Sequence, residues 1–141
     1  TEPLRELMGP ILVQLPPNWR ANPGRLREFL DAAPRELRWA IEFRHPDWLQ
    51  EPVYAVLREH NAALVIHDVI ADHPRVVTAD WVYLRYHGGP NGRYSEAEMV
   101  SEAAGIREHL SAGRDVYAFF NNDAHGWALE NLRQLITAVK G

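Results

Sequence analysis

The sequence predicts an α/β fold in which parallel strands alternate with helices. Short runs rich in β-branched and aromatic residues recur along the 141 residues, and segments with helical spacing separate most of them. Strand followed by helix, repeated along a chain, is typical of a parallel sheet with right-handed crossovers. A chain of this length with one such pattern builds a single core, so we expect one domain over residues 1–141.

Five runs have the composition of strands: residues 11–15, 38–43, 63–68, 81–87 and 115–121. Alternate residues of a strand share a face, and in these runs one face becomes polar toward the carboxyl end. The polar face carries Gln14, Glu42, Arg44, Arg85, His87 and Asn121. The other face of the last two strands is apolar, and we expect it to pack against helices.

Helix signals follow the first two strands. Asn22 is a predicted N-cap, with Pro23 in the first helical position, and Pro34 ends that helix. Pro52 opens a second helix, and Asn61 is suited to the left-handed residue that follows its end.

Two further helices follow the last two strands. Ser95 and Glu98 form a predicted capping box, and Gly113 closes the helix that they begin. The final helix carries apolar residues at helical spacing: Ala128, Leu132, Leu135, Ile136 and Val139. The connection over residues 69–80 has no amphipathic helical period, so we expect only a single turn or a short helix there.

Polar residues at the carboxyl ends of strands favour a (β/α) barrel over an open sheet, because barrels build their sites at that end. A complete barrel has eight strands and roughly 250 residues, whereas this sequence supplies five strands in 141 residues. We therefore predict a partial barrel. The chain begins with Thr1, and we expect it to be a piece of a longer polypeptide, or to associate through its two open strand edges.

Composition excludes several classes of function. A formal net charge of −4 and a pI near 5.9 argue against a nucleic-acid binder that works by bulk charge. The absence of cysteine excludes disulfides, thiolate nucleophiles and cysteine-based metal centres. No segment has the length and apolarity of a membrane span, and we expect a cytoplasmic protein without a membrane partner.

Four motifs carry a resemblance to a known family: GPILVQLPP at 9–17, EFRHPDW at 42–48, RYHG at 85–88 and FNNDAHG at 120–126. Together they resemble the YecE-like family, domain of unknown function 72, over essentially the whole chain. The resemblance implies a TIM-type barrel, of which this chain is similar to strands four to eight. It implies no settled activity.

Candidate catalytic residues lie at the strand ends. Glu42 stands two residues before Arg44 on one strand face, and His87 precedes two glycines that allow a ligand to approach the backbone. We predict general acid–base roles for Glu42, His87 and Asp68. The structural alternative is a buried ion pair of Glu42 with Arg44 or Arg85 that only orders the barrel interior.

Candidate substrate-binding residues surround them. They are Gln14, Arg44, His45, Arg85, Arg93, Asn121, Asn122, Asp123 and His125. The glycine-rich loop 88–93 could hold an anion with Arg93, although such a loop is also what a tight turn needs. Asn122 or Asp123 is the expected cap of the last helix, which would place His125 in its first turn.

The aromatic residues Trp19, Trp48 and Tyr94 either stack on a ligand or seal the edge of the core. A divalent metal at the barrel rim is the weaker alternative to an arginine-lined anion site, because no close pair of histidines on one helix fixes two ligands. We therefore predict no cofactor. A small anionic molecule is the expected ligand.

Two functions remain open from the sequence. The first is an enzyme, of hydrolase type or with other acid–base chemistry, that acts on a phosphorylated or phosphodiester substrate at the barrel mouth. The second is a non-catalytic module that binds an anionic ligand or a nucleic-acid end with the same arginines. Fold alone cannot separate them, because this architecture serves many chemistries.

Overall fold

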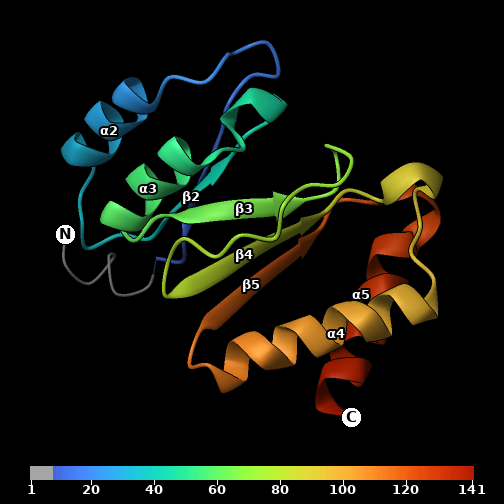
Figure 1. The fold of residues 1–141 in the computed structure, drawn as a ribbon. Coiled ribbons are helices and arrows are strands. Elements are labelled where there is room, and N and C mark those ends of the chain that lie inside the picture. The colour runs from blue at the N-terminus through green and yellow to red at the C-terminus, as the bar shows by residue number, and fades with distance from the viewer. Residues whose placement is uncertain (1–7) are drawn as a thin grey trace. The chain divides into compact units, whose positions relative to one another are not determined.

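The computed structural model describes residues 8–141, and strands alternate with helices along it (Figure 1). In chain order the elements are β1 (Ile11–Gln14), α2 (Pro23–Ala32), β2 (Trp39–Glu42), η1 (Pro46–Trp48), α3 (Glu51–Glu59), β3 (Ala63–His67), β4 (Trp81–Tyr86), η2 (Gly89–Asn91), α4 (Glu96–Ser111), β5 (Asp115–Phe120), η3 (Ala124–Gly126) and α5 (Trp127–Lys140). None of the helices within residues 8–141 is long and apolar enough to cross a membrane.

The predicted fold class is confirmed. The strand order is β1-β2-β3-β4-β5, and the pairs β1–β2, β2–β3 and β4–β5 are parallel. Sequential parallel strands joined through helices are the topology of part of a (β/α) barrel. Each predicted strand is present, with ends within one residue of those expected from the sequence. The connection between β3 and β4 contains bends and a turn and no helix, so of the two expected forms it has the turn and not the short helix.

The chain divides into two compact units, which we describe separately. The first unit comprises Thr1–Val65 and Pro74–Ala79, and the second comprises Ile66–His73 and Asp80–Gly141. The boundary falls within β3, so the two units share that strand.

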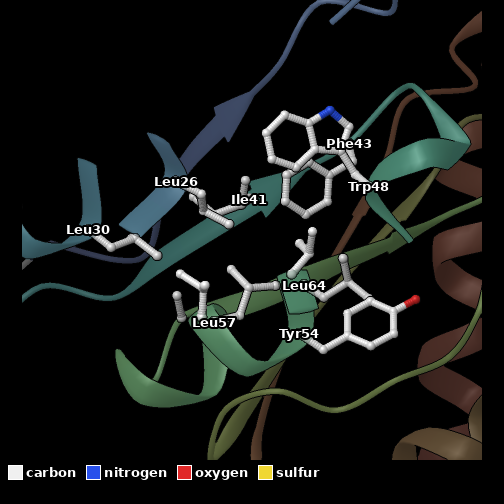
Figure 2. Close-up of a cluster of buried hydrophobic side chains, with 11 residues drawn as sticks. Leu26, Leu30, Ile41, Phe43, Trp48, Tyr54, Leu57 and Leu64 are labelled. Carbon is white, nitrogen blue, oxygen red and sulfur yellow. The ribbon is translucent and has the colours of Figure 1, made fainter. Parts of the chain in front are cut away.

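The first unit is built around one apolar cluster (Figure 2). Leu26 and Leu30 of α2 and Leu57 of α3 pack with Ile41 of β2, and all four side chains are buried. Phe43 stacks on Trp48 with ring centroids 4.8 Å apart and planes within 7°. Two helices thus cover one face of this unit's strands, as the apolar spacing predicts.

The helix boundaries follow the local signals in the sequence. The Asn22 side chain accepts a hydrogen bond from the Arg25 amide at 3.1 Å and caps α2, with Pro23 in its first turn. Asn61 adopts the predicted left-handed conformation after α3, at φ +51°. Ser95 accepts from the Glu98 amide at 3.1 Å and caps α4, and α4 ends before Gly113, whose φ is +81°.

In the second unit, α4 and α5 lie side by side along β4 and β5 (Figure 1). The Tyr86 hydroxyl donates to Glu102 of α4 at 2.9 Å, and the Tyr86 ring stacks on Phe120. The face of β4 that carries Tyr86 therefore meets the helices, as the sequence predicts. Arg85 lies opposite Phe119 in the register and belongs to the other face.

Candidate functional site

In the first unit, Glu42 and Arg44 form an ion pair at the carboxyl end of β2. Arg44 Nε donates to Glu42 Oε2 at 2.7 Å, and the side chains are 19% and 0% exposed respectively. A fully buried carboxylate is stable only when charge and hydrogen bonds compensate it. Gln14 lies opposite Glu42 in the β1–β2 register and is exposed.

The residues that follow this pair hold the loop between β1 and α2. His45 caps η1, because its Nδ1 accepts a hydrogen bond from the Asp47 amide at 3.0 Å. Asp47 Oδ2 in turn accepts from the Ala21 amide at 3.1 Å and from Arg20 Nε at 3.2 Å. The Ala21 amide, and then Arg20, hold the pKa of the Asp47 carboxyl below its usual value.

Trp48 and Trp19 differ in their burial. Trp48 is 4% exposed, and its Nε1 donates to the Trp19 carbonyl at 2.8 Å, so Trp48 belongs to the core. Trp19 is 50% exposed. Together with Val13 of β1 and Phe29 of α2, both tryptophans line a cavity of about 520 Å³ on the helix side of the unit.

In the second unit, Arg85 and His87 lie at the carboxyl end of β4. Arg85 Nη2 donates to Asn121 Oδ1 at 3.2 Å, and the backbone amide of Asn121 donates to the Tyr86 carbonyl at 2.7 Å. Arg85 and Asn121 thus meet across the ends of adjacent strands. The His87 ring lies 6.1 Å from the His67 ring, at right angles to it.

Asp68 is held in a local hydrogen-bond network rather than pointing to solvent. Its Oδ1 accepts from the His87 amide at 2.9 Å, and its Oδ2 accepts a hydrogen bond from the Tyr94 hydroxyl. The same hydroxyl accepts from the Gly88 amide at 2.7 Å. The Asp68 carboxylate thus accepts from one backbone amide and from one side-chain hydroxyl.

The glycine-rich loop 88–93 is ordered by internal contacts. The amides of His87 and Gly88 donate to Asp68 and Tyr94, so neither is directed to an anion. Arg93, predicted to bind such an anion, forms an exposed ion pair with Glu130 at 2.9 Å, and its guanidinium lies 5.8 Å from the Trp127 ring centroid.

The N-cap of α5 is not the residue that the sequence predicts. Neither Asn122 nor Asp123 caps α5; the N-cap is Gly126, with φ +74° and no side-chain hydrogen bond. His125 lies before the helix, in η3, with φ +58° and an exposed side chain. The prediction failed because a left-handed backbone, and not a side-chain oxygen, turns the chain into the helix.

Asn122 is buried and Asp123 is exposed, although the two are neighbours. Asn122 Nδ2 donates to the Gly92 carbonyl at 3.3 Å and to Asn131 Oδ1 at 3.0 Å. Asn122 therefore ties the loop 88–93 to α5.

Sequence reasoning missed Asn131, which is fully buried in α5. Its Oδ1 accepts from the Tyr94 amide at 3.2 Å, and its Nδ2 donates to the Tyr94 carbonyl at 2.9 Å. The signal available was an amide residue among the core-facing positions of an amphipathic helix. Tyr94, considered only as a stacking or sealing residue, is 8% exposed and is the centre of this network.

Among residues 8–141, no group of three or more His, Asp or Glu side chains is placed to hold a metal ion.

Comparison with solved structures gives relatives over nearly the whole chain. A DUF72 family protein from Thermotoga maritima is 27% identical, with a TM-score of 0.86, and covers 99% of this chain. A DUF72 family protein from Enterococcus faecalis is 21% identical, with a TM-score of 0.75 over 93% of this chain.

The match spans only part of each relative. It covers 62% of the Thermotoga maritima chain and 58% of the Enterococcus faecalis chain. The comparison with curated proteins gives no match. The sequence profile described as "Protein of unknown function DUF72" matches residues 1–141, the same family that the four motifs resemble, and the chain belongs to that family.

Proposed function

We propose that this chain contributes to an enzyme that acts on an anionic substrate, a phosphorylated or phosphodiester compound, at the carboxyl ends of its strands. The observation that carries the proposal is the placement of Arg85. Asn121 holds its guanidinium at the ends of β4 and β5, and His87 follows two residues later.

Guanidinium groups suit phosphate because their planar N–H groups match two of its oxygens. A histidine beside such a group can donate or accept a proton near neutral pH. Arg85 binds the anion in this proposal, and His87 serves as the general acid or base. Asn121 fixes the guanidinium.

The first unit has its own candidate, Glu42. Its buried carboxylate is ion-paired with Arg44 at the carboxyl end of β2, the end at which barrels build their sites. We retain Glu42 as a second acid–base candidate. The cytoplasm remains the proposed location, resting on the absence of cysteine.

Titration with inorganic phosphate and with a dinucleotide phosphodiester, followed by calorimetry, tests the anion site. Loss of one charge-assisted hydrogen bond of about 1.5–3 kcal/mol should raise the Kd of Arg85→Gln by about 10- to 100-fold. Arg107→Gln is the matched control, because Arg107 lies on the exposed surface of α4 and binds only the Ala138 carbonyl there. Equal affinity in both variants would contradict the proposal.

One observation favours the alternative, a non-catalytic binding module. Asp68, a predicted acid–base residue, has both carboxylate oxygens engaged by His87 and Tyr94. Hydrolysis of the phosphodiester separates the two functions. An enzyme should lose turnover in Glu42→Gln while binding is retained, whereas a binding module shows no turnover in the unaltered protein.

A further inference from the structure

Tyr94 occupies a central place in the second unit. Its hydroxyl donates to Asp68 and accepts from the Gly88 amide at 2.7 Å. A phenol has one donor and can also accept, so this arrangement uses it in both directions. The second oxygen of Asp68 accepts from the His87 amide at 2.9 Å.

Tyr94 is itself held on several sides. The Asn131 side chain binds both its amide and its carbonyl, at 3.2 and 2.9 Å. The rings of Tyr86 and Phe120 lie edge-on to it, at 5.6 and 6.2 Å. Burial, and then the hydrogen bond to Asp68, raise the pKa of the Tyr94 hydroxyl, so it keeps its proton and remains a donor.

The backbone of the loop that begins at Gly88 has little conformational freedom. Gly88 has φ +110°, and a Cβ placed on it would lie 2.9 Å from the Gly92 Cα. The backbone therefore closes tightly against itself. The His87 amide donates to the half-buried Asp68 carboxylate, and the Gly88 amide donates to the buried Tyr94 hydroxyl, which itself donates to Asp68.

We propose that Tyr94, with Asp68, is the positioning residue for His87: by fixing both peptides that flank His87, it sets the direction in which the imidazole is presented to a ligand. The ligand role rests on the proposed function, whereas the positioning does not. In this proposal Asp68 accepts the hydrogen bonds from the His87 amide and the Tyr94 hydroxyl, and it transfers no proton to substrate.

The test begins with the imidazole of His87, observed in ¹⁵N-histidine NMR spectra across a pH series without ligand. Tyr94→Phe keeps the ring and removes the hydroxyl, and it should shift the His87 titration midpoint and its tautomer signals. Tyr86→Phe is the matched control: it removes the hydroxyl that binds Glu102 and should leave His87 unchanged. If Tyr94→Phe does not fold, Asp68→Asn tests the same hydrogen bonds, because it replaces the carboxylate that accepts from the His87 amide and the Tyr94 hydroxyl.

A double-mutant cycle with inorganic phosphate supplies the second measurement. Tyr94→Phe should raise the phosphate Kd about threefold or more, within the range of couplings between contacting residues. Combined with His87→Gln, it should add nothing to the effect of His87→Gln alone. An unaltered His87 spectrum in both Tyr94→Phe and Asp68→Asn, or additive effects on Kd, would overturn the proposal. If His87→Gln leaves phosphate binding unchanged, the ligand role of His87 fails, and the spectra still decide the positioning.

Discussion

At the scale of single residues, burial separates charges that look alike in the sequence. Glu42 is fully buried with Arg44, whereas Arg93 and Glu130 keep nearly half of their side chains exposed, at 49% and 44%. Burying a charged group costs desolvation free energy, which in a buried ion pair is offset by the partner charge. Removing one member therefore leaves an uncompensated buried charge. An exposed pair is solvated in either state and contributes little.

This difference predicts the effect of Glu42→Leu. The variant should lose about 3 kcal/mol of unfolding free energy, the lower end of the range for a broken buried pair, because Arg44 remains partly in contact with water. Urea denaturation measures it. Glu59→Leu, which breaks the exposed pair with Arg27, is the control and should lose far less. A loss below about 1 kcal/mol for Glu42→Leu would mean that water reaches the pair.

At the scale of elements, the strands and helices supply the framework, and the loops at their ends supply the specific geometry. The loop after β4 contains Gly88, Gly89 and Gly92, all with positive φ. Its neighbour α4 contains Gly105, where a Cβ would meet no atom within 4 Å outside its own helix backbone and chain neighbours. The same residue type therefore has opposite consequences in the two elements.

Alanine substitution tests this contrast. Gly88→Ala should destabilise the fold by more than about 1 kcal/mol, because the left-handed φ and the 2.9 Å approach to the Gly92 backbone both oppose a side chain. Gly105→Ala should stabilise it by about 0.5–1 kcal/mol, because alanine loses less entropy in a helix. Thermal unfolding of both variants measures the signs. A Gly88→Ala protein as stable as the parent would show that the loop has another conformation.

At the scale of the whole molecule, the strand order ends at β1 and β5. Within residues 8–141, each of these strands has a neighbouring strand on one side only. In the second unit, β5 carries Phe119, which is 46% exposed and lines an apolar cavity of about 370 Å³ together with Leu129 of α5. Exposed strand edges with apolar side chains favour pairing with further strands.

We therefore predict that the 141-residue polypeptide alone associates through these edges. Size-exclusion chromatography with light scattering should give a mass above 16.2 kDa. Phe119→Lys should shift the population toward monomer, because a charge at an edge opposes pairing. Val100→Lys, at a residue of α4 that is 52% exposed, should have no such effect. A monomer that unfolds cooperatively would contradict the prediction.

The sequence by itself determined the elements and their order. Strand composition, the Asn22 and Ser95 caps and the left-handed Asn61 are local signals, so each could be recognised from residues a few positions apart. The alternation of polar and apolar residues likewise assigned Arg85 and Tyr86 to opposite faces, because a strand has a period of two. The four motifs are short continuous segments, so the resemblance to the family could also be recognised from the sequence.

The hydrogen-bond partner of each polar residue depends on how distant segments pack against one another. Tyr94 meets Asp68 across 26 residues and Asn131 across 37, and Arg93 meets Glu130 across 37. No spacing in the sequence encodes such contacts, because they depend on how the strand ends, the loop and α5 pack together. For that reason the contacts of Asp68 with Tyr94 and of Arg93 with Glu130 could not be predicted from the sequence, and Asn131 was not singled out. Local sequence pattern predicts which strand carries a polar residue. The hydrogen-bond partners of that residue depend on tertiary packing.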